Sequence, residues 1–478
     1  MKKIFVLAFT ALAYLSANAQ SELFPLYYSQ YGMNGTAAYI GKAGAIGALG
    51  GDIMSAQYNP AGLGIYRSSE ITFTSGIDIT SSNATFNGLK ADDSYPSYNF
   101  GNIGMVLDFN NGKSPFRHVQ LSFGINRLMN FNNRNKIVRN NLSSSFINDN
   151  ALNLITNTDD DFIRSGVVDL DTATNTISSV YESGTFNQIK AIRESGYLNE
   201  FSMSISTNYE NWLYLGATVG IPFGDYTCKT SFSEERFVDG VSTGYYNYNQ
   251  EQYLSATGIN LKLGAIVRPV EWLRLGAAIH TPTYYTVDDD YYSEVQYNYT
   301  YGGWFPTYSY NMQSPWRFLG SAAILLGKST GAFQGTISVD YEYADYSNMS
   351  LIIDDDVQTE TTLNNNIDAS FGGASTIRVG GELKYGRLRA RAGYAYFGSP
   401  YESDDINNGS WNYITCGVGY KGKTFGFDLA YAYGKNSDAK YYMYDTYDLA
   451  TRVWNGDSNP AKTNTTKHLL QATLSVRF

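Results

Sequence analysis

Apolar and polar residues alternate along much of this chain, and the alternation is clearest at its C-terminal end. There one face would carry Leu470, Ala472, Leu474 and Val476, and the other would carry Gln471, Thr473, Ser475 and Arg477. Successive side chains of a β-strand point to opposite faces, so this segment predicts a strand between an apolar and a polar medium. The terminal aromatic residue, Phe478, is typical of a bilayer boundary.

The same period of two recurs along the chain and predicts an all-β fold. We expect a transmembrane antiparallel β-barrel of about 14 strands, an even number as in single-chain outer-membrane barrels. A soluble sandwich would also alternate, but its strands would be shorter and would lack aromatic residues gathered at their ends. The predicted strands cover residues 69–80, 97–109, 118–131, 197–210, 212–235, 246–268, 272–296, 307–327, 332–345, 375–385, 387–397, 411–421, 424–435 and 467–478.

The connections between these strands alternate between tight and long, which predicts which end of the barrel faces the periplasm. The tight turns, such as Tyr385-Gly386-Arg387 and Lys421-Gly422-Lys423, would face the periplasm. Long connections such as residues 81–96 would face outward, and the longest, residues 132–196, would form an extracellular loop. This loop contains two stretches with helical spacing, and both have two interpretations. The first has Leu142, Phe146, Ile147 and Leu154 on one face, and the second has Phe186, Ile189 and Arg193. They either pack only against other residues of the loop or form an outer groove that captures a hydrophobic ligand.

The composition suits an exported membrane protein. The 478 residues include 42 Tyr, 25 Phe and 46 Gly, and the net charge is −10. Tyrosine supplies interfacial belts, and the acidic balance argues against a nucleic-acid partner. Residues 1–20 predict a cleaved signal peptide, with Lys2 and Lys3, an apolar run and the small residues Ala17 to Ala19. No later apolar run reaches the roughly 18 residues of a spanning helix, so we expect a closed sheet in the outer membrane.

Residues 21–68, which we call the plug segment, differ from the rest of the chain. They are rich in Gly and Ala and contain Asp52, which can cap a short helix, and Asn59-Pro60, which has the form of a helix N-cap followed by the first helical position. A fourteen-stranded barrel is too wide for its own side chains to close. The plug segment therefore predicts a hatch inside the lumen, followed by the barrel over residues 69–478.

The signal peptide, the Gly/Ala-rich stretch with Asp52, the Asn59-Pro60-Ala61 triplet, the immediate first strand and the terminal Phe478 resemble the FadL/TodX family. The stretch from Leu273 to Tyr285 is similar to a strand of that family as well. Members are outer-membrane transporters of long-chain fatty acids and hydrocarbons. The resemblance implies a barrel plugged by a hatch, with ligand bound above it and released sideways into the membrane. It also implies hatch roles for Asn59, Pro60 and Ala61, with Gly62 and Leu63 adjoining.

Alternation places many charged residues on the inward face of the predicted barrel. Asp340 and Glu342 would face Arg378, Glu382 and Lys384 on the next strand, and the strand after that carries Arg387, Arg389 and Arg391. Such cross-strand pairs either stabilise the wall or form a surface that steers a carboxylate. An alkyl chain that crossed this hydrated lumen would gain nothing from the hydrophobic effect. A lateral exit through the wall into the membrane is therefore favoured. Gly124, Gly216 and Gly220 are candidate positions for the required break in the wall.

The chain offers little for catalysis or metal binding. It has only three histidines, and we expect no Ser-His-acid triad, no metal site and no cofactor. His280 falls on the inward face, where it is either a hydrogen-bonded lumen residue or part of a substrate site together with Phe146 and Ile147. The sequence thus favours passive uptake of hydrophobic small molecules across the outer membrane. A barrel that serves secreted proteins as a scaffold or shuttle is the alternative, and an enzyme ranks third.

Overall fold

The computed structural model describes residues 21–478, apart from residues 111, 113, 148–159, 172–175, 180, 182, 328–332, 355, 444, 449–452 and 457–459. The predicted signal peptide lies outside the described residues. Among the described residues, none of the helices is long and apolar enough to cross a membrane.

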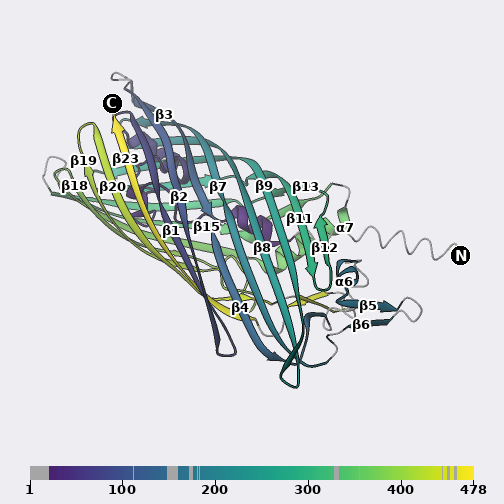
Figure 1. Ribbon diagram of the computed structural model, residues 1–478. Helices are drawn as coiled ribbons and strands as arrows, with labels where there is room; N and C mark the ends of the chain where they lie inside the picture. The colour runs from purple at the N-terminus through teal and green to yellow at the C-terminus, as the bar shows by residue number, and fades with distance from the viewer. Residues whose placement is uncertain are drawn as a thin grey trace.

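The wall of the molecule is one antiparallel sheet that closes on itself. In the described residues nineteen strands belong to this sheet, and the first strand, β1, pairs with the last, β23. Three pairs of strands, β3 with β4, β10 with β11 and β13 with β14, follow one another along single wall strands, while β12 and β16 are short additions. The result is the predicted fourteen-stranded barrel, which lies obliquely in Figure 1.

The strands differ widely in length, from three residues in β16 to 30 in β9. The sheet contains β1 (Glu70–Phe86), β2 (Leu89–Asn110), β3 (Phe116–Asn130), β4 (Asn133–Leu142), β7 (Thr185–Tyr209), β8 (Leu213–Val238), β9 (Val241–Val270), β10 (Leu273–His280), β11 (Tyr284–Gln296), β12 (Thr300–Trp304), β13 (Tyr308–Gln313), β14 (Arg317–Leu326), β15 (Phe333–Asp345), β16 (Ser350–Ile352), β17 (Gly373–Tyr385), β18 (Leu388–Phe397), β19 (Trp411–Lys421), β20 (Phe425–Tyr441) and β23 (Ala461–Arg477). Outside it lie two hairpins, β5 (Val168–Asp171) with β6 (Thr176–Ser179), and β21 (Asp445–Asp448) with β22 (Val453–Gly456).

The alternation predicted from the sequence is confirmed in the wall. Leu470 and Leu474 of β23 are half-exposed on the outside, whereas Gln471 and Thr473 between them are buried on the inside. The outer surface therefore carries large apolar side chains over many strands, as expected where a barrel meets lipid. The inner face carries polar side chains and the plug segment.

Two of the predicted strands, 272–296 and 307–327, are each broken in the middle. The breaks lie side by side, because Thr283 between β10 and β11 exchanges backbone and side-chain hydrogen bonds with Ser314 between β13 and β14. Each break contains a proline, Pro282 or Pro315, which has no N–H group to give to the ladder. The alternation alone did not reveal this interruption.

The connections also differ from the prediction at two places. A two-residue turn at Asn87-Gly88, both with positive φ (46° and 85°), replaces the expected outer loop over 81–96. The expected loop over 132–196 instead contains β4, α6 (Asp160–Ser165), β5, β6 and the first part of β7. Helical spacing at Phe186, Ile189 and Arg193 was misleading, because these residues belong to β7.

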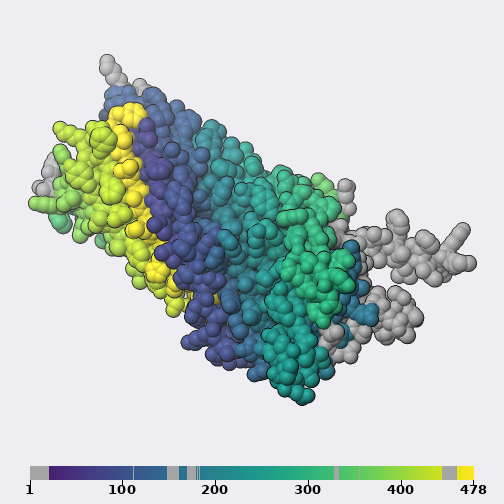
Figure 2. Space-filling model, in the orientation of Figure 1, coloured from purple at the N-terminus to yellow at the C-terminus, as the bar shows by residue number. Residues whose placement is uncertain are grey.

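The plug segment lies inside the barrel, where its short helices are visible between the strands in Figure 1 and hidden behind the wall in Figure 2. It contains α2 (Leu23–Ser29), α3 (Ala37–Ile40), α4 (Ser55–Tyr58) and the 3₁₀ helix η2 (Pro60–Ile65). Two further helices, η3 (Tyr346–Asn348) and α7 (Val357–Ser370), lie between β15 and β17 along the chain. The predicted plug within the lumen is therefore part of the fold.

Candidate functional site

Asn59 joins the plug segment to itself and to the barrel wall. Its side-chain oxygen accepts a hydrogen bond from Ala61 N (3.2 Å), which caps η2, and Pro60 occupies the first helical position as predicted. Its amide nitrogen donates to the carbonyl oxygens of Gly47 (2.8 Å) and of Ala265 in β9 (3.3 Å). One buried side chain thus fixes two parts of the plug against the wall.

The part of the wall that faces Asn59 has no projecting side chains, because glycines stand there. Gly216 of β8 and Gly264 of β9 are neighbours in the ladder. A Cβ atom on Gly264 would lie 2.0 Å from Asn59 Oδ1, and one on Gly216 would lie 2.3 Å from the carbonyl carbon of Pro60. The sequence made Gly216 a candidate for a break in the wall, but in the structure Gly216 packs against Pro60 of the plug segment. We call the contact between Asn59-Pro60 and these two glycines the glycine seat.

The remaining predicted hatch residues lie next to the glycine seat. Gly62 N donates to Asn59 O (2.9 Å), and Gly62 O accepts from Gly51 N (3.0 Å). Leu63 is fully buried in an apolar cluster that includes Val106 of β2. The structure therefore brings the five residues from Asn59 to Leu63 together at the contact between plug and wall.

Asp340 of β15 is a second anchor for the plug segment. Its Oδ2 atom accepts hydrogen bonds from Ile46 N (2.9 Å) and Gly47 N (2.8 Å). It is a register partner of Arg378 in β17. The predicted cross-strand ion pair does not form there, because the carboxylate binds plug amides instead.

Asp52 acts differently from the helix cap that the sequence suggested. Its carboxylate accepts hydrogen bonds from Met54 N (3.0 Å) and from the Thr36 hydroxyl (2.8 Å), so it joins two turns of the plug rather than capping α4. Burial raises the pKa of Asp52, and the nearby Lys42 opposes that shift.

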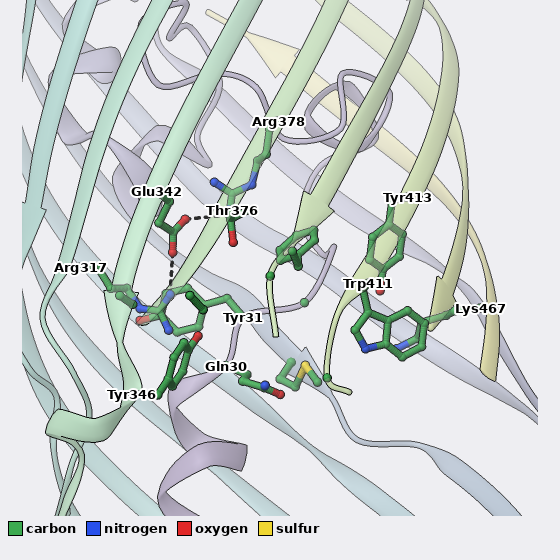
Figure 3. A pocket seen from close by; sticks show the side chains of 17 residues that line it. Gln30, Tyr31, Arg317, Glu342, Tyr346, Thr376, Arg378, Trp411, Tyr413 and Lys467 are labelled. Carbon is green, nitrogen blue, oxygen red and sulfur yellow. Dashed lines mark hydrogen bonds and ion pairs between the residues drawn. The ribbon is translucent and has the colours of Figure 1, made fainter. Parts of the chain in front are cut away.

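Above the glycine seat the contact between plug and wall opens into a cavity of about 80 Å³. Figure 3 shows it between the plug residues after α2 and the inner faces of the wall strands. Its lining comes from segments far apart in the chain, namely Gln30, Tyr31, Gly32, Met129, Arg317, Glu342, Ala344, Tyr346, Ala374, Thr376, Arg378, Phe397, Gly398, Gly409, Trp411, Tyr413 and Lys467.

Two guanidinium groups and one carboxylate dominate the charge of this cavity. Glu342 accepts from Arg317 (2.6 Å) and from Arg378 (2.7 Å), and all three side chains are buried. Arg317 also donates to the carbonyl oxygen of Ser29 at the end of α2. The Nε and Nη1 atoms of Arg378 find no hydrogen-bond acceptor among the described residues. The trio therefore carries one positive charge in excess, and two donor nitrogens of a buried side chain are without an acceptor in the described part of the chain.

Aromatic rings cover much of the rest of the cavity wall. The guanidinium carbon of Arg317 lies 4.1 Å from the ring centre of Tyr31. Trp411 and Tyr413 of β19 stack with their ring centres 5.8 Å apart. The remaining cation at the rim, Lys467, lies 3.1 Å from a carboxylate oxygen of Asp78, so its charge is compensated.

The three residues predicted to bind substrate do not line this cavity. His280 of β10 points at the plug, with Nε2 3.0 Å from the carbonyl oxygen of Tyr58. Phe146 and Ile147 belong to a separate apolar cluster, in which the rings of Phe146 and Phe232 lie 5.3 Å apart. The structure thus separates His280 from Phe146 and Ile147, and their predicted role in binding stays a prediction.

The wall ladder is interrupted between β2 and its neighbour. β2 pairs with β3 from Asn102 to Asn110, and in the described residues no ladder partner faces residues 89–101 on that side. β4 instead pairs with β7 and lies close to β1 and β2, and Arg134 O accepts a hydrogen bond from the Ser82 hydroxyl of β1 (2.5 Å). Of the three candidate glycines, Gly124 is near the break, two residues before the last paired residue of β3, Asn126.

Side chains rather than backbone hydrogen bonds bridge this break. The ring of Tyr95 in β2 lies against two guanidinium groups, those of Arg134 (4.7 Å) and Arg193 (5.3 Å). Further along, Arg127 lies between the rings of Phe100 (6.0 Å) and Tyr197 (4.8 Å). Contacts of this kind can separate without breaking a strand ladder.

Sequence reasoning missed Arg317, Tyr31 and Trp411 as cavity residues. Arg317 follows the Ser314-Pro315-Trp316 break, and this proline was the available signal. The prediction also placed Arg387 inside the lumen, whereas it is exposed in the turn between β17 and β18. The ion pair of Arg391 with Glu382 (2.6 Å) does form across the neighbouring strands β18 and β17, and Arg391 also pairs with Asp428 of β20 (2.5 Å), on the far side of β19. In the described part of the chain, no three His, Cys, Asp or Glu residues are grouped to hold a metal ion.

Neither the family models nor the curated proteins that were compared with the chain match it. Solved structures do match. A FadL homologue of Pseudomonas aeruginosa has a TM-score of 0.59 and 12% identity, covering 94% of this chain and 100% of that one. The toluene transporter TodX of P. putida has a TM-score of 0.53 and 11% identity, covering 94% of this chain and 99% of that one. The toluene transporter TbuX of Ralstonia pickettii has a TM-score of 0.50 and 13% identity, covering 95% of this chain and 100% of that one.

The structural similarity shows a shared fold, and at 11–13% sequence identity it leaves the cargo open. Each match covers 94–95% of this chain. The resemblance noted in the sequence is thereby confirmed at the level of the fold, and the chain is a β-barrel with the fold of the FadL homologue and of TodX.

Proposed function

We propose that this protein is a passive, non-enzymatic channel that carries hydrophobic small molecules across the outer membrane. The observation that carries the proposal is the cavity above the glycine seat, which is enclosed by plug and wall and lined by aromatic rings. Pockets for small molecules are typically apolar with a few polar groups that orient the ligand. The arrangement of plug, cavity and interrupted wall supports capture, binding and release in that order.

We further propose that the cargo is an amphipathic carboxylate, such as a long-chain fatty acid, rather than a neutral hydrocarbon. The cavity holds Arg317 and Arg378 against a single carboxylate, that of Glu342. Arg378 has unused N–H donors, and hydrogen bonds to charged groups contribute about 1.5–3 kcal/mol. A ligand carboxylate would satisfy these donors, which a hydrocarbon cannot do.

Binding requires movement of the plug residues that border the cavity. The volume of about 80 Å³ is smaller than the roughly 150 Å³ cavity that holds benzene in an engineered protein core. The wall strands are held by ladders on both sides, so the adjustable part is the segment from Gln30 to Gly32, which has no regular secondary structure. Its displacement would enlarge the cavity without disturbing the glycine seat.

Release would occur sideways, between β2 and β4. An alkyl chain gains about 25 cal/mol per Å² when its surface leaves water, so a path from the cavity directly into lipid is more favourable than one down a polar lumen. The side-chain bridges at Tyr95 and Arg127 close this path in the described state. The predicted binding of ligand by Phe146 and Ile147 would precede this step at the outer end of the barrel.

The test is binding of hexadecanoate and of hexadecanol to the purified protein in mild detergent. We expect Arg378→Met to weaken hexadecanoate binding about tenfold or more and to leave hexadecanol binding unchanged. Arg268→Met is the matched control, because Arg268 lies near the end of β9, away from the cavity, and its side chain donates to the carbonyl oxygen of Glu271. Equal binding of hexadecanoate by wild type and Arg378→Met would overturn the carboxylate assignment. A wild-type protein that binds neither ligand would overturn the channel proposal.

One feature favours the alternative of a scaffold or shuttle for secreted proteins. β9 has 30 residues, whereas about 9–11 residues suffice for a strand to cross a bilayer. The strands β7 to β9 therefore project well beyond the membrane and offer surface to a protein partner. Co-purification of a secreted protein with a barrel that carries no lipid would support this alternative.

A further inference from the structure

The outside of the barrel carries an apolar groove that the proposed transport function does not use. It has a volume of about 550 Å³ and runs over the outward faces of β17, β18 and β19, near the end with the short turns. Ala390 of β18 forms its floor, between Leu383 and Val418 in the ladder. The short alanine side chain between two larger ones leaves a depression in the wall.

Large side chains close the groove at its periplasmic end. Tyr385, Leu388 and Tyr420 are register partners in one row across three strands, and all are strongly exposed. Tyrosine at this position is typical of the boundary between hydrocarbon and head groups. The groove thus begins at head-group depth and extends into the hydrocarbon region.

Two unpaired cations lie beside that end of the groove. Arg387 and Lys423 occupy neighbouring turns, since Lys421 N donates to Arg387 O (2.8 Å), and both side chains are exposed. Among the described residues neither forms an ion pair, and the polar side-chain partner of Arg387 is the hydroxyl of Tyr420 (3.0 Å), a residue that lines the groove. The acid on β17 in this region, Glu382, is already paired with Arg389 and Arg391.

We propose that this groove is a binding site for an anionic glycerophospholipid of the periplasmic leaflet. One acyl chain fills the depression over Ala390, and the head-group phosphate lies between Arg387 and Lys423. An apolar groove facing lipid is filled by hydrocarbon, and the adjoining unpaired positive charges select a lipid with net negative charge. A second copy of this chain fits less well, because a symmetric contact through the groove would bring the same cations together.

The test is native mass spectrometry of the detergent-purified protein titrated with phosphatidylglycerol and, separately, phosphatidylcholine. We expect one tightly bound phosphatidylglycerol and about thirtyfold weaker binding in Arg387→Gln/Lys423→Gln, from roughly 1 kcal/mol for each cation. The control is Lys90→Gln/Lys462→Gln, which removes the same charge from exposed residues at the opposite rim. Unchanged phosphatidylglycerol binding in the Arg387/Lys423 variant would overturn the proposal.

A second pair of variants tests the groove itself. Ala390→Phe fills the depression and should abolish the tightly bound lipid. Ala217→Phe places the same ring on the outside of β8, between Ile205 and Leu263, away from the groove, and should leave lipid binding unchanged. Tight binding that survives Ala390→Phe would contradict the site. Hexadecanoate binding in the lumen should be the same in all these variants, which separates this inference from the proposed function.

Discussion

The plug meets the wall in two ways, and the contrast separates a fixed contact from an adjustable one. At the glycine seat, Asn59 and Pro60 approach the backbone of β8 and β9 so closely that no Cβ atom fits between them. At the cavity, residues 30–32 border an open volume together with Arg317, Glu342 and Arg378. The lower contact leaves no space for a side chain, whereas the upper one borders a cavity that movement of the plug residues can enlarge.

This difference indicates which part of the plug can respond to cargo. Moving Asn59 would break three hydrogen bonds and expose buried surface, but moving residue 30 or 31 would mainly exchange a cation–ring contact for a contact with ligand. We therefore expect the glycine seat to stay closed while the cavity opens. Lateral release would then need no passage past the plug.

The strongest challenge to the fixed contact is a side chain on its floor. Gly264→Val would place a Cβ atom 2.0 Å from Asn59 Oδ1, and we expect the plug to leave its seat. Ion conductance in planar bilayers should rise from near zero to open-pore values. Gly320→Val on β14 is the control, because a Cβ there meets no atom within 4 Å. A closed Gly264→Val channel would show that the seat is not what holds the plug.

Removing the carboxylate from the cavity should have the next largest effect. Glu342→Gln leaves two buried guanidinium groups without a counter-charge, and breaking a buried ion pair costs about 3–5 kcal/mol. The free energy of unfolding in urea should fall by this amount. Glu251→Gln removes an ion pair with Lys229 that has a similar distance (2.7 Å) but lies on an exposed surface. This variant should lower the free energy of unfolding by no more than about 1 kcal/mol. Similar losses in both variants would refute the burial argument.

A milder change at the glycine seat tests the hydrogen bonds alone. Asn59→Ala keeps the close approach but removes the cap of η2 and the bonds to Gly47 and Ala265. We expect about 1–2 kcal/mol less protection of residues 44–65 in hydrogen exchange. The barrel strands far from the plug serve as an internal reference. Loss of protection throughout the barrel would mean that the plug and wall unfold as one unit.

The smallest expected effect is a pH dependence of the plug. Because burial raises the pKa of Asp52, the folded plug binds a proton more readily than the unfolded one. Its stability should be greatest below about pH 4, the ordinary range of an aspartate, and decline as the pH rises through the raised value. Asp52→Asn should remove this dependence in hydrogen exchange corrected for the intrinsic rate. A plug that becomes more stable toward neutral pH would contradict the sign.

Prediction from the sequence succeeded where a property repeats along a strand. The outward placement of Leu470 and Leu474 and the number of wall strands followed from the period of two. The interruptions of the wall at Pro282 and Pro315 are single local features, so the repeating pattern could not reveal them. Helical spacing at Phe186 to Arg193 also misled, because a few apolar residues fit either period when the segment is short.

The candidate site was less predictable than the fold for a geometric reason. Asn59 and Pro60 are adjacent in the sequence, and their local chemistry indicated a capped turn. The cavity joins Tyr31, Arg317 and Trp411, which lie far apart in the sequence and become neighbours only when the sheet closes around the plug. No local pattern carries that information.

By itself the sequence determined the face on which each wall residue lies, the presence of a separate plug segment and the capped turn at Asn59. Only the tertiary structure decided that Asp340 binds plug amides while Glu342, two residues away, bridges two arginines. The physical reason is that alternation specifies a direction, inward or outward, but not the height of a residue in the lumen or what lies opposite. Those depend on the register between strands and on the path of the plug, which all the strands establish together.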